Sequence, residues 1–349
     1  MPENKQYYFM DMKWRSFTVL ILLSCIFPLK GWAQDPEFSQ FYAAPAHLNP
    51  SMIGFSWDPR IAINYRHQYP QFGNAFLTFA ASYDQHFDNL NSSFGVSVLA
   101  DRAGEGGIYN TYQVNGLYAY QLQFSSDLQV KVGAQIGYLN QSLDWSKLVF
   151  TDMIDPTTGA PVGSTAELTP EKTSIHRLDI GGGIVAYNSK FYIGASAKHV
   201  TTPSLAFTNS NDNDNDLKIR TSLHAGRVFY LGQKIVGESQ FYISPNILFI
   251  NQGRHFQLNA GSYLGKGLFF GGLFIRHTIR NTDALIFLAG LKAGIVRVGY
   301  SYDINIGPLA TGAGAHEIAT IIDFGQRKGA NDKIRRKKAA ECPEIFSPQ

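Results

Sequence analysis

The sequence predicts an all-β protein, an outer-membrane antiparallel β-barrel of about 14 strands with long outer loops and short periplasmic turns. Three observations lead to this fold class. Only 16% of the 349 residues are charged, whereas 13% are aromatic and 33 are glycine. Segments of roughly 9 to 15 residues alternate between apolar and polar positions, which is the period of a strand. The connections between these segments alternate between short and long, as they do in membrane barrels.

Composition also excludes several other classes of protein. The chain has too many aliphatic and aromatic residues for a disordered protein, and a net charge of +3 gives no case for nucleic-acid binding. After the N-terminal region, no apolar run approaches the roughly 18 residues of a membrane helix. The main alternative is a soluble β-sandwich or propeller, but its strands would be about half as long.

The first 33 residues are typical of a secretory signal peptide. Two basic residues precede an apolar run at 17–29, and the small residues Gly31 and Ala33 stand at the −3 and −1 positions of a cleavage site before Gln34. The alternatives are a single anchor helix and a lipoprotein acylated at Cys25. If residues 1–33 are removed, Cys342 is the one cysteine left, so no intramolecular disulfide can form.

Residues 34–58 precede the first strand and have no clear period. Phe38, Phe41 and Tyr42 lie there among polar and small residues, so this stretch is not a lipid-facing strand and its aromatic rings need cover. We expect an N-terminal periplasmic or plug segment. It could fill the lumen, close the base of the barrel or dock a periplasmic partner, and these alternatives stay open.

The barrel itself is predicted to span residues 59–324. In the stretch 128–138, for example, every even position is apolar or Ala, and every odd position is polar or Gly. Val132 is therefore expected to face lipid, and Lys131 to face the lumen as ordinary lining. Fourteen such segments occur, near 60–69, 75–87, 91–102, 107–123, 127–143, 177–188, 190–200, 217–231, 234–251, 254–264, 266–277, 284–291, 295–303 and 315–324.

All the long connections fall at one end of this predicted barrel. They are residues 144–176, 201–216 and 304–314, and every second connection is a short turn instead. Because short turns are periplasmic in such barrels, an even number of strands places both termini in the periplasm.

Two of the long loops have features of their own. Trp145, Leu148 and Phe150 give the loop 144–176 apolar anchors, so we expect it to fold back over the barrel mouth, either as a lid or as a cargo-binding surface. The second loop carries three aspartates from Asp212 to Asp216, spaced two residues apart, which raises the possibility of a calcium site. The EF-hand pattern fails because leucines stand where its glycine and its final glutamate should be, so a solvated acidic loop is favoured.

No catalytic motif, cofactor motif or metal-ligand spacing is found. The sequence therefore predicts no enzyme, no catalytic residue, no cofactor and no metal. The glycines at 181–183 lie inside a strand and suggest close packing against the wall rather than phosphate binding. Four histidines could meet acids only through folding, as in barrel proteases and lipases: His224, His255, His277 and His316.

The C-terminal tail, residues 325–349, is basic. From residue 326 onward it has seven Lys or Arg and three acidic residues, a net charge of +4, and Arg335 and Arg336 lie in its centre. It is either a solvated periplasmic terminus or a contact for an acidic envelope partner, lipid headgroups or peptidoglycan.

Three stretches resemble a known family. The chain reads Gln-Asp-Pro-Glu-Phe-Ser-Gln-Phe-Tyr at 34–42 and Leu-Asn-Pro-Ser-Met-Ile-Gly at 48–54. A second match, Asp-Trp-Ser-Lys-Leu-Val-Phe, begins at residue 144 and continues to residue 159, and a third is the basic stretch before Cys-Pro at 342–343. These motifs, in this order, resemble the PorP/SprF family of type IX secretion outer-membrane proteins of Bacteroidetes. Ser51 departs from the alanine usual in that family.

The resemblance implies a non-enzymatic outer-membrane component of the type IX secretion and gliding machinery. Such a protein supports export or surface anchoring of a large adhesin or other secreted cargo. Its expected partners are a cargo C-terminal domain, secretion components of the envelope and outer-membrane lipid, with no nucleic acid. A porin-like small-solute channel is the alternative, and a barrel enzyme is a third. Partner contacts are expected from Trp145, Leu148 and Phe150 outside, and from Phe38, Phe41, Tyr42, Arg335 and Arg336 in the periplasm.

Overall fold

The structure is a computed structural model. It describes residues 35–56, 58–72, 76–125, 127–207, 215–233, 239–279, 283–306 and 314–324. The expected signal peptide, the basic tail with Arg335 and Arg336, and Asp212 of the acidic loop lie outside the described residues. What was predicted for them stays a prediction.

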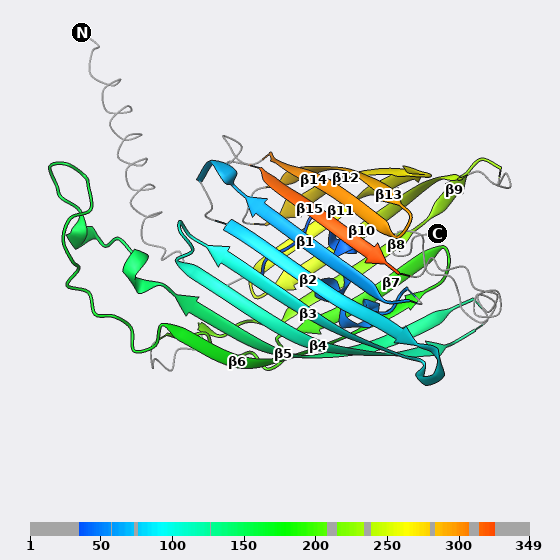
Figure 1. Ribbon diagram of the computed structural model, residues 1–349, viewed down its shortest axis with the longest axis horizontal. Coiled ribbons are helices and arrows are strands. Elements are labelled where there is room, and N and C mark those ends of the chain that lie inside the picture. The colour runs from blue at the N-terminus through cyan, green and yellow to red at the C-terminus, as the bar shows by residue number, and fades with distance from the viewer. Residues whose placement is uncertain are drawn as a thin grey trace, which may run out of the picture. The chain divides into compact units, whose positions relative to one another are not determined.

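The alternating segments form a ring of long antiparallel strands (Figure 1). The strands are β1 (Arg60–Gln68), β2 (Phe76–Phe87), β3 (Ser92–Ala103), β4 (Tyr109–Gln123), β5 (Gln129–Leu143), β6 (Ser174–Tyr187), β7 (Phe191–Lys198), β8 (Arg220–Arg227), β9 (Phe229–Leu231), β10 (Phe241–Gln252), β11 (His255–Lys266), β12 (Phe269–Thr278), β13 (Ala284–Ala293), β14 (Val296–Asn305) and β15 (Ala315–Asp323). Within the described residues, no helix has the length and hydropathy needed to cross a membrane.

The ring is a closed barrel of 14 wall strands, as the sequence predicts. Each strand pairs with its neighbours, and β1 pairs with β15 to close the ring, for example Arg60 with Asp323. β8 and β9 count as one wall strand because both pair with β10. Pro245 of β10 has no amide hydrogen to donate, and the ladder is interrupted near it, between the two parts.

The two faces of the wall are those expected from the period-two pattern. On β5, Val132 and Ile136 have 46% and 61% of their surface exposed on the outside, while Lys131 and Gln135 are buried inside at 0% and 3%. An apolar outer face and a polar inner face are what a barrel in lipid requires.

The two ends of the barrel differ in their connections. At the turn end, the connections are residues 88–91, 124–128, 188–190, 232–240, 267–268 and 294–295. At the loop end, they are 69–75, 104–108, 144–173, 199–219, 253–254, 279–283 and 306–314. One differs in length from the expected pattern: the connection 232–240 is longer because β10 begins at Phe241 rather than near 234. The connection 253–254 has two residues, as many as the predicted strand bounds left there.

The barrel is not hollow. Residues 35–56, here called the lumen segment, lie inside the ring, where Figure 1 shows them in blue. This segment has three short helical turns, η1 (Phe41–Ala43), α2 (Pro45–Leu48) and η2 (Pro50–Met52), and almost every residue from Phe38 to Ser56 is buried. The main hydrophobic core of the protein therefore forms between the lumen segment and the inner wall.

Candidate functional site

The lumen segment crosses the barrel from one end to the other. At the loop end, the Asp35 amide donates to Oε1 of Gln252, the last residue of β10, at 3.0 Å. At the turn end, the Ser56 hydroxyl donates to Asp323, the last residue of β15, at 2.7 Å. The sequence led us to expect both ends of the mature chain in the periplasm. Instead, Asp35 and Phe324, the first and last described residues, lie at opposite ends of the barrel, because the N-terminal segment runs back through the lumen.

Backbone amides of the segment are held by a buried carboxylate. Glu317 of β15 accepts from the amides of Ser39 and Gln40 at 2.7 and 2.9 Å. The Gln40 side chain donates to the Glu317 carbonyl at 3.2 Å and lies against Gly299, where a Cβ atom would overlap its amide oxygen. The amides of Ser39 and Gln40 thus have partners on the wall although the segment is not a strand of the sheet.

The Ser39 hydroxyl lies at the centre of an ion-pair network. It donates to Asp303 at 2.7 Å and accepts from Arg66 and Arg276 at 2.6 and 2.7 Å. Each of these arginines also pairs with Asp303 at 2.9 Å, and Arg66 pairs with Glu317 at 3.2 Å. Two cations and two carboxylates are therefore buried together with their charges balanced, which offsets the cost of removing them from water.

Residues 35–37, here called the arm, carry the loop-end contacts. Asp35 lies 2.6 Å from His199 Nε2, and His199 Nδ1 lies 3.0 Å from Asp179. Glu37 accepts a hydrogen bond from Arg220 Nε at 2.8 Å and pairs with the same guanidinium through a second nitrogen.

The neighbouring charges shift the pKa values of His199 and Asp35. Burial alone would lower the pKa of His199, but the nearby carboxylates of Asp35 and Asp179 raise it to about 9. Burial alone would raise the pKa of Asp35, but the charges of His199 and Arg220 hold it well below its usual range. Both groups are therefore charged at neutral pH.

The middle of the segment touches the wall directly. The Asn49 amide nitrogen lies within 3.2 Å of the Ile184 and Ala195 carbonyl oxygens, and its oxygen accepts from the Ser51 amide at 2.9 Å. Opposite them, a Cβ atom at Gly133 would overlap the Ser51 backbone, and one at Gly183 would overlap the Asn49 side chain. Gly183 belongs to the triple glycine, and the close wall packing expected of that motif is what the structure shows.

At the turn end, the segment is fixed by three charged side chains. Lys131 donates to the carbonyls of Ile53 and Gly54 at 2.6 and 3.0 Å, and Asp84 accepts from the Gly54 amide at 2.6 Å while pairing with Arg60 at 3.0 Å. The sequence led us to treat Lys131 as ordinary lumen lining, and that was wrong. Its ammonium group is completely buried because the lumen segment covers it.

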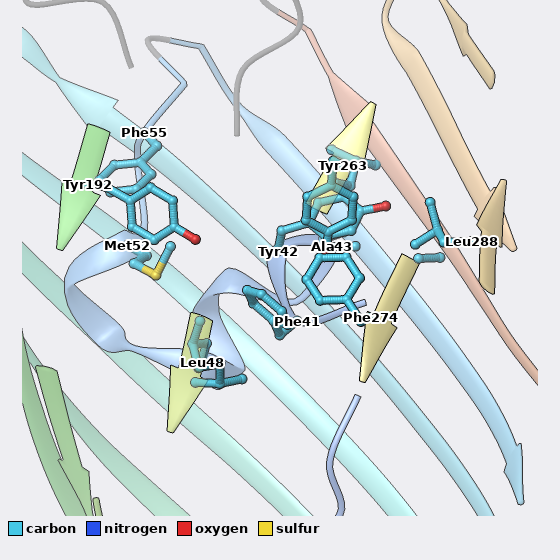
Figure 2. Close-up of a cluster of buried hydrophobic side chains, with 14 of the residues drawn as sticks. Phe41, Tyr42, Ala43, Leu48, Met52, Phe55, Tyr192, Tyr263, Phe274 and Leu288 are labelled. Atoms are coloured by element: carbon cyan, nitrogen blue, oxygen red, sulfur yellow. The ribbon is translucent and has the colours of Figure 1, made fainter. Parts of the chain in front are cut away.

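Aromatic rings of the lumen segment also pack against aromatic rings of the inner wall (Figure 2). The rings of Tyr42 and Tyr263 are 4.6 Å apart, and Phe41 meets Phe274 edge-on at 5.9 Å. Phe38, Phe41 and Tyr42 have at most 5% of their surface exposed. In this conformation the three rings contact the wall, and their predicted contact with a periplasmic partner stays a prediction.

A cavity of about 710 Å³ lies at the loop end, with the arm on its inner side. The side chains of Asp35 and Glu37 keep 23% and 17% of their surface exposed there, in contrast to the buried residues that follow. Polar residues on the surrounding strands line this loop-end cavity, among them Arg66, Thr78, Asp101, His255, Arg276 and Asp303.

The loop 144–173 does not cover the barrel mouth. Residues 156–164 are all exposed, and the loop, green in Figure 1, runs past the ends of β5 and β6. The expectation that this loop folds back over the barrel mouth is therefore wrong, which rules out the lid, one of the two roles considered for it. Trp145 and Phe150 pack against each other at 4.9 Å, and both, like Leu148, are half-buried at the base of the loop. Their rings stabilise the loop, and their predicted contact with cargo is untested.

Residues 31–322 match a protein family described as "Type IX secretion system membrane protein PorP/SprF". This match covers most of the chain. The chain belongs to the PorP/SprF family. The resemblance drawn from its motifs is thereby confirmed, and the described residues of its first match, 35–42 and 48–54, belong to the lumen segment of this PorP/SprF protein.

Solved structures with some likeness to this PorP/SprF protein are other barrels. The toluene transporter TbuX of Ralstonia pickettii has a TM-score of 0.47 and 9% identity, over 81% of this chain and 94% of that one. Omp33 of Acinetobacter baumannii has a TM-score of 0.42 and 10% identity, over 78% and 100%. These scores are too low to support an inference about function. Among proteins with curated functions, none matches significantly.

Sequence reasoning missed the wall residues that hold the lumen segment. A signal was present, because charged residues such as Lys131, Asp303 and Glu317 stand at inward positions of strands although only 16% of the chain is charged. The candidate enzyme histidines are placed apart: His224 contacts Asn49 in the lumen, and His277 pairs with Asp283 at the rim. Within the described ranges, no three His, Cys, Asp or Glu side chains are grouped so that they could hold a metal ion.

Proposed function

We propose that this PorP/SprF protein is a non-enzymatic outer-membrane component of type IX secretion that helps export a secreted cargo, such as a large adhesin, or anchor it at the cell surface. The observation that carries the proposal is the filled lumen. Since the chain's own segment occupies the barrel interior through buried ion pairs and hydrogen bonds, function is assigned to the ends of the barrel rather than to a pore.

The loop end is proposed to face outward and the turn end to face the periplasm, as in other barrels with short periplasmic turns. With this orientation, the loop 144–173 projects from the cell surface. It exposes apolar side chains, among them Leu168 at 88% and Val162 at 53%, and exposed apolar groups on a projecting loop favour a protein contact. The basic tail is proposed to meet envelope partners in the periplasm.

A porin-like small-solute channel is the competing function. It requires a continuous water-filled path, and the buried contacts of residues 38–56 oppose such a path. The two proposals differ in whether the intact protein conducts ions.

The experiment is deletion of residues 156–165, which are almost fully exposed and lie away from the barrel wall. The expected result is normal barrel assembly with release of cargo from the cell surface into the medium, because the projecting contact is lost. Replacement of the same ten residues by a Gly-Ser sequence of equal length controls for loop length. Cargo retained at the surface in the same amount after deletion would rule out the outer-loop contact.

A further inference from the structure

We propose that the inner wall at the loop end of β7 and β8 is a binding site for an acidic peptide segment of an exported protein, and that the arm occupies this site until such a segment displaces it. The cationic site consists of Lys198, His199 and Arg220. The inference rests on the proposed function, which brings exported cargo to the loop end.

The cationic site has like charges held together by the fold. Lys198 and Arg220 are directly opposite each other in the β7–β8 ladder, and both face inward. Like charges in this position repel and destabilise a sheet unless anions lie between them. Their exposed fractions are 7% and 4%, so water does little to screen the repulsion.

The arm supplies the anions that the site needs. The three cationic groups of the site have one carboxylate of the wall beside them, that of Asp179, which pairs with His199. The pKa of His199, raised to about 9, means that it contributes a full charge at neutral pH. The wall therefore has an excess of two positive charges, and Asp35 and Glu37 cancel it. Any segment that replaces the arm must bring about two negative charges.

The arm is also the part of the lumen segment that can leave without unseating the rest. Ser39 and Gln40, the next anchored residues, are fixed by Glu317 on the other side of the lumen. Beyond them, the chain is buried as far as Ser56. The arm borders the loop-end cavity of about 710 Å³, which gives an incoming segment a place beside its target.

A peptide is favoured over other anions because the arm, which occupies the site, is itself a peptide and binds through both its carboxylates and a backbone amide. Two carboxylates two residues apart, on either side of Pro36, pair with His199 and Arg220, and the Asp35 amide adds a hydrogen bond to Gln252. An acidic stretch of another chain can present the same groups. An oligogalacturonate carries carboxylates on successive rings but has no backbone amide.

The first test measures peptide binding by full-length protein in detergent micelles. The probe is a fluorescein-labelled peptide with the arm's sequence, Gln-Asp-Pro-Glu-Phe-Ser, and its control has Asn and Gln in place of Asp and Glu. The double variant Asp35→Asn/Glu37→Gln should bind the acidic probe about tenfold more tightly than the native chain does, because its own arm competes less. Adding Arg220→Gln should abolish this gain.

A matched variant controls for net charge. Asp155→Asn/Glu167→Gln removes two acidic side chains from the exposed loop and should leave probe binding at the native level. Equal binding of the acidic and amide probes, or no gain in the arm variant, would overturn the proposal. So would trigalacturonate binding that excludes the peptide, since it would assign the site to an anionic sugar.

The second test keeps the cationic site and both arm carboxylates intact. Pro36→Cys is introduced in a Cys25→Ser/Cys342→Ser background, so that it is the one cysteine of the chain, and its rate of labelling by a charged maleimide is followed. The acidic probe should raise this rate several-fold because it displaces the arm, whereas the amide probe should not. An unchanged rate at saturating probe would contradict displacement. Neither test involves cargo, so the proposed function can fail in cells while peptide binding stands, and the reverse also holds.

Discussion

At the scale of single residues, Lys131 shows how a charge is accommodated inside the barrel. Its ammonium group donates to Ile53, Gly54 and the Ser93 hydroxyl, at 2.6, 3.0 and 2.9 Å, with no surface left exposed. A buried ammonium is costly unless its hydrogen bonds are all made. The lumen segment therefore stabilises the wall charge, and the wall charge fixes the lumen segment.

The first prediction follows for Lys131→Gln. The shorter neutral side chain cannot reach both carbonyls, and hydrogen bonds to a charged group contribute about 1.5–3 kcal/mol. We expect the free energy of unfolding to fall by about that amount, measured by urea denaturation in micelles and by the temperature at which the barrel loses its fast migration in SDS gels. Lys190→Gln, in an exposed turn, is the control and should change neither measurement.

A second residue prediction concerns two glycines on adjacent strands. A Cβ atom at Gly133 would overlap the Ser51 backbone, whereas the nearest atoms to a Cβ at Gly116 are 4.0 Å away. Gly133→Ala should therefore keep the lumen segment from binding in its place, since the atoms that the added methyl group would overlap are backbone atoms of Pro50 and Ser51. We expect limited proteolysis to cut residues 35–56 in that variant only. Equal protection in Gly133→Ala and Gly116→Ala would show that the segment shifts to accommodate the methyl group.

At the scale of elements, the arm is the part of the lumen segment whose attachment depends on protonation. His199 lies between the carboxylates of Asp35 and Asp179. The cations Lys198 and Arg220 are nearby, and Glu37 pairs with Arg220. Its pKa is raised from the ordinary 6.5 to about 9. The pairing of protonated His199 with Asp35 therefore stabilises the arm fully below about pH 6.5, and this stabilisation is lost as pH rises through 9.

The third prediction is an alkaline release of the arm. Hydrogen exchange at the amides of residues 35 and 37 should accelerate as pH passes 9, beyond the intrinsic rise with pH, while exchange at residues 39–40 follows the intrinsic rise alone. Acid should not release the arm above about pH 4, because the pKa of Asp35 lies well below its usual value and its contribution is lost only as pH falls through that lowered pKa. His199→Gln should abolish the alkaline step, and a step that persists in this variant would assign it to another group.

At the scale of the whole molecule, the wall could be predicted from the sequence, whereas a segment that fills the lumen was one of three alternatives that the sequence left open. Strand period is a local property, so alternation in stretches such as 128–138 was enough to locate β5 and its faces. The contacts of the lumen segment join residues far apart in the chain: Ser39 to Glu317 and Asp35 to His199. No local pattern encodes such pairs, and a segment with three short helical turns has no period to detect. Phe38, Phe41 and Tyr42 showed that cover was needed, but not which surface provides it.

The last prediction tests whether the lumen segment closes the barrel. The intact protein should be nearly silent in planar bilayers, because buried contacts fill the path between the two ends. Deletion of residues 36–52 should open a water-filled lumen, since a barrel of 14 strands is wider than its own side chains can fill. The wall should survive the deletion because Arg66, Arg276, Asp303 and Glu317 still balance one another, and the heat-dependent gel shift will report whether the barrel forms.

The control is the deletion of residues 156–165, which removes exposed loop and leaves the lumen filled. We expect steady ion conductance from the 36–52 deletion and none from the loop deletion. The Gly133→Ala variant offers the same test with the full chain present, because an unseated segment should give intermittent current rather than a steady one. If instead the intact protein conducts steadily, the lumen segment does not block the pore. The porin-like function would then be the better account of this barrel.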